Sequence, residues 1–148
     1  MRGMSPRYDE DFYAWTQHQA ALLRTEKWQD LDSANLAEEL ESLGKRDLRE
    51  LESRLEVLVM HLLKWCYQPE RRERGRSWRS TILEQRGRIE RLLVQSPSLR
   101  LQVAALVTEG YPRTRQRTLA ETQLAESVIP PTCPWTVAQI LDDAFWPA

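Results

Sequence analysis

Two residues on one predicted helix have side chains that could act on a phosphodiester. Arg54 and His61 are seven positions apart, a spacing that returns to nearly the same face of a helix two turns later. An arginine could bind the scissile phosphate, and a histidine titrates near neutral pH and can move a proton. Any amphipathic helix with one arginine and one histidine can show this pattern by chance. We therefore favour a structural His61, hydrogen-bonded at the rim of the core, and keep catalysis as the alternative.

An arginine-rich stretch follows on the C-terminal side of this pair. Its side chains could form paired hydrogen bonds to phosphate oxygens, and Trp78 could stack on a base. However, glutamates interleave with the arginines, and the net charge of the chain is -1, whereas nucleic-acid binders are usually basic. We favour a surface that faces solvent or a partner, with its positive charge balanced by the acidic group Glu38, Glu39 and Glu41. The arginines concerned are Arg71, Arg72, Arg74, Arg76, Arg79, Arg86, Arg88 and Arg91.

The sequence predicts no metal site and no cofactor. Glu38, Glu39 and Glu41 could be metal ligands in a helical bundle, but di-iron bundles place a histidine three residues after a glutamate. Neither His18 nor His61 follows an acidic residue by three. No glycine-rich phosphate loop, HExxH motif or GxSxG motif occurs. Two cysteines fit neither a disulfide framework nor a metal knuckle, so we predict reduced thiols.

Length and composition predict one folded domain over residues 1–148, with residues 1–8 flexible. Hydrophobic residues make up 41% and charged residues 29%, as in an ordinary globular protein. No apolar run approaches the roughly 20 residues that cross a bilayer, and the N-terminus does not resemble a signal peptide, so we expect a cytoplasmic protein. Residues 57–117 carry thirteen basic and five acidic residues, between acidic flanks. Such a basic middle is neutralised within the fold, across a dimer, or by an external anion.

The central predicted element is a helix over residues 46–68 with one apolar seam, formed by Leu48, Leu51, Leu55, Leu58, Leu62 and Trp65. Gly44 is expected to end the preceding helix, and Pro69 to end this one. A further helix begins at Ser96-Pro97. We expect Gly110-Tyr111-Pro112 to interrupt it, with residues 113–123 as a kinked continuation or a separate piece. Other helices are predicted over residues 9–24, 33–43, 78–95 and 135–144.

Two of these helices are expected to bury a defined stripe. In residues 33–43 the stripe consists of Leu36, Leu40 and Leu43. In residues 78–95, Arg79, Arg86 and Arg88 are expected to lie mostly off the buried face, which is formed by Trp78, Ile82, Gln85, Ile89, Leu92 and Leu93. This helix should run antiparallel to the central helix, across the arginine-rich turn.

Six stretches, in order along nearly the whole chain, resemble the bacterial domain-of-unknown-function family 29, many of whose members are cyanobacterial. They are DFYAWTQ (11–17), LAEELESLG (36–44), HLLKWCYQPE (61–70), SWRSTI (77–82), SPSLR (96–100) and CPWTVAQILDD (133–143). The resemblance implies an all-helical fold and brings no activity, cofactor or catalytic residue. The spacing of Arg54 and His61 is also similar to the catalytic Arg-to-His motif of HEPN-type helical ribonucleases. The polar residue expected after the arginine is Leu55 here.

Taken together, these patterns predict an all-α single-domain bundle of five or six helices with a long central helix. The function we favour is a non-enzymatic interaction or structural module that binds a protein partner or itself through its charged faces. The alternative is an RNA-associated or HEPN-like ribonuclease that uses Arg54, His61 and the arginine-rich surface. A small-molecule binder is a third class, and no membrane partner is expected.

Overall fold

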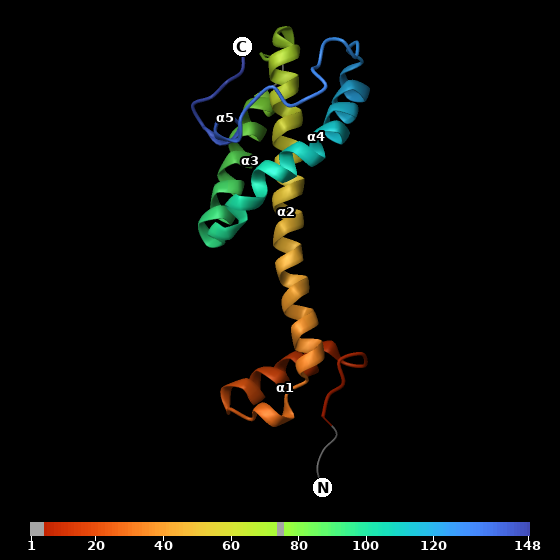
Figure 1. Ribbon diagram of the computed structural model, residues 1–148, viewed down its shortest axis with the longest axis vertical. Helices are drawn as coiled ribbons and strands as arrows, with labels where there is room; N and C mark the ends of the chain where they lie inside the picture. The colour runs from red at the N-terminus through yellow and green to blue at the C-terminus, as the bar shows by residue number, and fades with distance from the viewer. Residues whose placement is uncertain (1–4, 74–75) are drawn as a thin grey trace. The chain divides into compact units, whose positions relative to one another are not determined.

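The computed structural model describes residues 5–73 and 76–148, with the backbone alone for Arg76. Within these residues the chain is all-α, with five α-helices, three short 3-10 helices and no strand (Figure 1). The α-helices are α1 (Phe12–Arg24), α2 (Ser33–Tyr67), α3 (Arg76–Gln95), α4 (Arg100–Thr122) and α5 (Val137–Leu141). The 3-10 helices are η1 (Trp28–Asp30), η2 (Pro69–Arg71) and η3 (Pro97–Leu99). The predicted all-α fold with a long central helix is confirmed.

Helix α2 is longer than predicted, because Gly44 does not end a helix. A glycine that terminates a helix usually adopts a left-handed conformation, and no described glycine has a positive φ. Gly44 is exposed inside a continuous helix of 35 residues. A glycine in a helix interior costs only about 1 kcal/mol relative to alanine, which the flanking helix formers offset. The prediction of two helices over residues 33–43 and 46–68 was therefore wrong.

Contacts divide the chain into two compact units, Met1–Lys45 and Arg46–Ala148, here called the N-terminal and C-terminal units. The N-terminal unit contains α1, η1 and the first turns of α2. Trp15 is its central side chain, and its indole Nε1–H donates to Asp32 Oδ2 at 3.0 Å. The Tyr8 and Phe12 rings pack on Trp15. Helix α1 begins at Phe12 because Asp11, rather than an earlier residue, caps it through the Ala14 N–H.

The predicted flexible segment 1–8 falls partly outside the described residues. Nothing is described for residues 1–4. Tyr8, by contrast, is half-buried and its hydroxyl donates to Glu39 Oε1. The last residue of the segment predicted to be flexible is therefore anchored to α2.

The core of the C-terminal unit forms around the predicted apolar seam of α2. Leu51, Leu55, Leu58 and Leu62 are at most 2% exposed, and α3 runs antiparallel to this part of α2 (Figure 1). Leu48 and Trp65 are half-buried. The other elements contribute a further set of buried side chains: Ile82, Ile89, Leu93, Val103, Val107, Tyr111, Ile129 and Ile140.

Helix α4 continues through Pro112, where an interruption was predicted. Proline has no backbone N–H, so it cannot donate a hydrogen bond to a carbonyl of the preceding turn. Here, however, Pro112 is exposed while Gly110 and Tyr111 are buried, and the Tyr111 hydroxyl donates to the Pro130 carbonyl at 2.6 Å. The α4 helix starts later than predicted, because Pro97–Leu99 forms a 3-10 turn.

The last helix is shorter than the predicted range 135–144. It spans Val137–Leu141 and begins at a capping box, in which Thr136 and Gln139 bond to each other's backbone N–H groups. The Asp142 backbone is extended, so the helix cannot continue beyond Leu141. Among the described residues, no helix is long and apolar enough to cross a membrane.

Candidate functional site

Arg54 lies on α2 in the C-terminal unit, and its guanidinium group is already paired. Its Nε and Nη2 atoms contact Glu50 Oε1 at 3.0 and 2.9 Å, and Nη1 donates to Gln85 Oε1 of α3 at 3.3 Å. A shallow hollow of about 230 Å³ lies beside it, lined in part by Ser53 and Val57. A phosphate that bound here would have to displace Glu50 or add to its negative charge.

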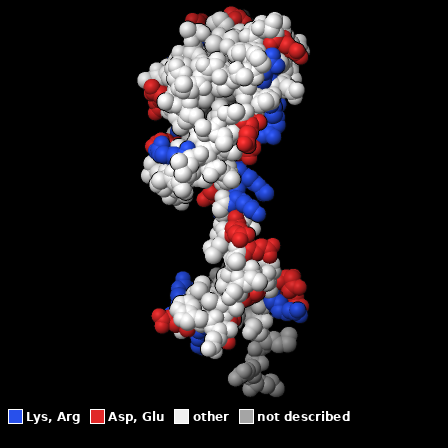
Figure 2. Space-filling model, viewed as in Figure 1, with Lys and Arg blue, Asp and Glu red and all other residues white. Residues whose placement is uncertain are grey.

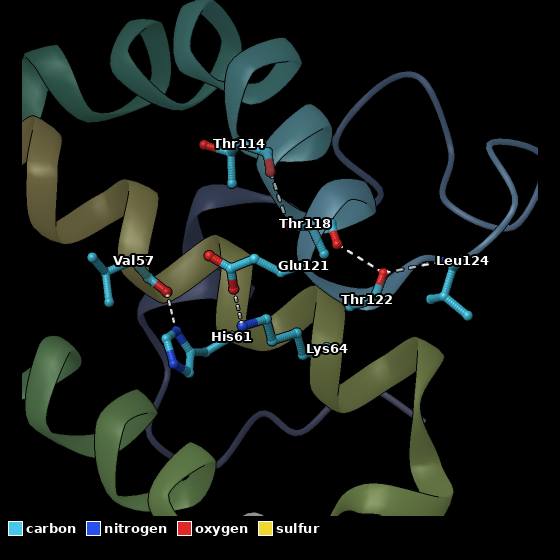
Figure 3. A network of polar contacts seen from close by, with 8 residues as sticks. All are labelled: Val57, His61, Lys64, Thr114, Thr118, Glu121, Thr122 and Leu124. Atoms are coloured by element: carbon cyan, nitrogen blue, oxygen red, sulfur yellow. Dashed lines mark hydrogen bonds and ion pairs between the residues drawn. The ribbon is translucent and has the colours of Figure 1, made fainter.

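His61, two turns further along α2, is half-buried and turned toward its own helix. Its Nδ1 atom lies 2.7 Å from the Val57 carbonyl oxygen (Figure 3). A carbonyl can only accept, so Nδ1 carries the proton. Burial lowers the pKa of His61, opposed by the bond to Val57 and by the Glu121 carboxylate, while the Lys64 charge lowers it further. The imidazole is therefore neutral at neutral pH.

The polar groups around His61 join α2 to α4. Lys64 Nζ contacts Glu121 Oε2 at 2.5 Å, and this hydrogen bond is the main cause of the lowered pKa of Glu121 (Figure 3). On α4, the Thr118 hydroxyl donates to the Thr114 carbonyl and the Thr122 hydroxyl to the Thr118 carbonyl, at 2.8 and 2.7 Å. Each donor thus has a partner within the fold. This arrangement supports a structural network, and the catalytic role of Arg54 and His61 stays a prediction.

Three arginines of the predicted anion surface contact the C-terminal segment instead. Arg72 Nη2 donates to the Pro147 carbonyl at 3.4 Å, its Nε donates to the Trp65 carbonyl of α2 at 2.6 Å, and its guanidinium carbon lies 5.1 Å from the centre of the Trp65 ring. The Arg79 guanidinium lies 4.8 Å from the centre of the Trp146 ring. Such cation–π contacts hold an arginine against an aromatic face. These side chains therefore secure residues near the C-terminus of the chain.

Arg86 is the third arginine that contacts the C-terminal segment, and it is the most buried of the three, with 2% of the residue exposed. Its Nε donates to the Ile140 carbonyl at 2.8 Å, and its Nη2 to the Phe145 carbonyl at 2.9 Å, with Gln139 at 3.5 Å. Burial lowers the pKa of Arg86, opposed by Asp143 and Asp142. Arg86 is thus a buried cation that satisfies carbonyl groups at and beyond the end of α5.

The sequence prediction that Arg86 lies off the buried face of its helix was wrong. Arg86 follows Ile82 by four positions and precedes Ile89 by three, and all three side chains are buried. This spacing was the available signal. The spacing alone does not indicate burial, because an arginine in an apolar stripe normally lies at the margin of that stripe.

The other arginines of this group that the structure describes are exposed or paired with an acidic residue. Arg88 pairs with Glu84 on the same helix at 2.9 Å, and Arg71 and Arg91 are exposed. Arg74 and the side chain of Arg76 lie outside the described residues, and Trp78 is half-buried. On the face shown in Figure 2, basic side chains of the described residues are interspersed with acidic ones. The predicted anion or partner contact of this group stays a prediction.

The N-terminal unit presents an apolar groove between α1 and the start of α2. The groove has a volume of about 310 Å³, and its principal apolar lining consists of Phe12, Trp15, Leu23, Leu36, Leu40 and Leu43. Four of these side chains are largely open: Leu40 is 68% exposed, Phe12 50%, Leu43 47% and Leu23 43%. The prediction that Leu36, Leu40 and Leu43 form a buried stripe was therefore wrong for Leu40 and Leu43. Among the described residues of this unit, α1 and the start of α2 bury Trp15 and Leu22, and no further α-helix is present to cover the groove.

Among the described residues, no group of three or more histidine, cysteine, aspartate or glutamate side chains is arranged to hold a metal ion. Both cysteines are free thiols. Burial is the first cause that raises the pKa of each, Cys66 and Cys133. Neither thiol is activated as a nucleophile, because the reactive form is the thiolate.

Comparison with known families gives one match over nearly the whole chain. The model of the family described as "Domain of unknown function DUF29" matches residues 7–146 of 148. The chain therefore belongs to this family, as its sequence motifs suggested. Comparison with curated proteins and with solved structures gave no match.

Proposed function

We propose that this DUF29 protein is a non-enzymatic protein-interaction module and that it docks its partner in the apolar groove of the N-terminal unit. The observation that carries the proposal is the exposure of four large apolar side chains, from two helices, around one groove. Scattered exposed leucines are normal, but apolar side chains gathered in one groove are typical of a binding surface.

The energetics of the groove support a docking role. Fully burying a Leu or Phe side chain stabilises by about 1.5–3 kcal/mol. Because Phe12, Leu23, Leu40 and Leu43 are each roughly half open, a partner that covered them would gain about 1 kcal/mol from each. The adjoining Trp15 is buried beneath them and gives the groove a rigid aromatic floor.

The contacts of Arg54 and His61 also favour the interaction module over a ribonuclease. Arg54 is held by Glu50 and Gln85, and His61 by the Val57 carbonyl. A ribonuclease site would need both side chains free to reach a phosphate. The ribonuclease remains the alternative, and it predicts RNA cleavage that His61→Ala abolishes. A cytoplasmic location also stays part of the proposal.

The test is a capture experiment with the full-length chain as bait in a lysate of its native host. The bait variant is the double substitution Leu40→Ser and Leu43→Ser, compared with the wild type. Leu101→Ser is the matched control, because Leu101 is a leucine on α4, outside the groove, and 84% exposed.

The proposal predicts proteins that the wild type and Leu101→Ser retain but the double variant loses. Circular dichroism should show the same helix content in all three baits, because each replaced side chain is exposed. If the wild type and the double variant captured the same proteins, the groove would not be the docking site.

A further inference from the structure

We propose that the groove of the N-terminal unit binds an amphipathic helix from a partner protein, with Lys or Arg residues beside the apolar face of that helix. The inference rests on the proposed function and specifies the occupant of the same groove. It follows from the dimensions of the groove and from the charge around it.

The dimensions of the groove fit a short helix. Its lining runs from Phe12 to Leu23 along α1 and from Leu36 to Leu43 along α2, which at 1.5 Å per residue is about 16 and 10 Å. Two to three turns of a helix have that length. A helix that packs in such a groove presents apolar side chains at positions i, i+3 or i+4, and i+7. No β-strand of the described N-terminal unit offers an edge to an extended peptide.

The charge around the groove is negative. Residues 5–45 contain nine acidic and four basic residues. Glu39 lines the groove itself, and Glu38 and Glu41 are exposed on the same helix. The hydrogen bond to Glu39, with burial and with the charges of Glu38 and Asp32, raises the pKa of Tyr8 to about 12. Glu39 therefore places a carboxylate in the lining of the groove, within a unit that carries more acidic than basic residues, and a basic helix complements this charge.

The same charge disfavours two other occupants of the groove. A second copy of the chain would bring its own acidic N-terminal unit against Glu39, and like charges at an interface reduce affinity. An anionic membrane surface would be repelled for the same reason. A partner helix with acidic residues would also be repelled by Glu39. A partner helix with lysines beside its apolar face would instead place a positive charge near Glu39.

The experiment uses two synthetic helical peptides of about 14 residues, which gives four turns. Both carry leucines at helical spacing, and the remaining positions are Lys in one peptide and Glu in the other. Each is labelled with a fluorophore, and its binding to the full-length chain is measured by fluorescence anisotropy at several salt concentrations. The protein variants are Leu40→Ser with Leu43→Ser, Glu38→Gln with Glu39→Gln, and the control Leu101→Ser.

The lysine peptide should bind the wild type and the Leu101→Ser control equally, and the leucine double variant about thirtyfold more weakly. The glutamine double variant should bind it several-fold more weakly, and salt should reduce the wild-type affinity toward that of this variant. The glutamate peptide should bind the wild type more weakly than the lysine peptide does.

Three outcomes would overturn the inference. The first is equal or tighter binding of the glutamate peptide. The second is loss of the lysine peptide's affinity in the glutamine variant but not in the leucine variant, which would indicate charge attraction without docking. The third is concentration-dependent dimerisation of the wild type, measured by analytical ultracentrifugation and lost in the leucine variant. Any of these, combined with groove-dependent capture from lysate, would refute the basic helix and leave the interaction module standing.

Discussion

The role of Arg86 as an internal anchor makes a quantitative prediction for Arg86→Met. Methionine fills a similar length of space but offers no donor to the carbonyl groups of Ile140 and Phe145. A hydrogen bond from a charged donor stabilises by about 1.5–3 kcal/mol, so the bonds at 2.8 and 2.9 Å together contribute about 3–6 kcal/mol. The contact with Gln139, at 3.5 Å, is too long to add much.

Part of this stabilisation is offset by the burial of the guanidinium group itself. Among the described residues, Arg86 Nη1 is buried without a hydrogen-bond partner, which costs about 1–3 kcal/mol and is relieved by the substitution. The net prediction is a loss of about 3 kcal/mol in the free energy of unfolding. With a slope of about 1–3 kcal/mol per molar urea, the midpoint of the transition should fall by about 1–3 M.

The assay is urea denaturation followed by tryptophan fluorescence. Trp146 lies within 5.5 Å of the Arg86 guanidinium, so its emission reports on the affected region. The control is Arg88→Met on the same helix, where an exposed pair with Glu84 should contribute less than about 0.5 kcal/mol. Equal midpoints for Arg86→Met and the wild type would refute the anchor, because they would mean that the buried bonds contribute no net stability.

Two further predictions concern α2. Because the folded state lowers the pKa of His61, protonation favours the unfolded chain, so stability should fall as the pH drops below the unfolded value of about 6.5. His61→Gln should flatten that part of a stability curve measured between pH 5 and 8, and an unchanged slope would contradict it. Gly44→Ala should raise stability by about 0.5–1 kcal/mol, since the added Cβ meets nothing within 4 Å. Circular dichroism during denaturation measures this, and a destabilised variant would indicate that α2 breaks at Gly44.

The seam of α2 could be predicted because it depends on local spacing alone. Leucines at three- and four-residue steps share one face of a helix, and in the C-terminal unit the other elements bury that face. For that reason Leu51, Leu58 and Leu62 were identified correctly. Pro69 likewise marks the end of the helix, because its ring excludes a helical continuation.

Other features could not be predicted because they depend on competition between local and tertiary effects. Gly44 and Pro112 both weaken a helix, but neither penalty is large enough to end one when neighbouring residues favour continuation. Arg86 occupies a position in an apolar stripe, and its burial depends on carbonyl groups more than fifty residues away. No local pattern indicates that a distant loop will supply those acceptors.

The groove illustrates a different limit of the sequence pattern. Leu36, Leu40 and Leu43 have the same spacing as the seam residues, yet Leu40 and Leu43 are exposed. Periodicity states which side chains share a face, but it does not state what covers that face. In the C-terminal unit the cover comes from α3 and α4.

The small core of the N-terminal unit adds a consequence for binding. Among its described residues, the buried side chains are Trp15, Gln19 and Leu22, and so few buried groups make a marginal unit on its own. A helix that covered the groove would supply the missing third side and bind only the folded form of the unit. Binding and stability are then linked, because a ligand of the folded state stabilises it in proportion to the logarithm of its concentration above the dissociation constant. Under the proposed function, the exposed leucines form one half of a core, and the partner helix supplies the other half.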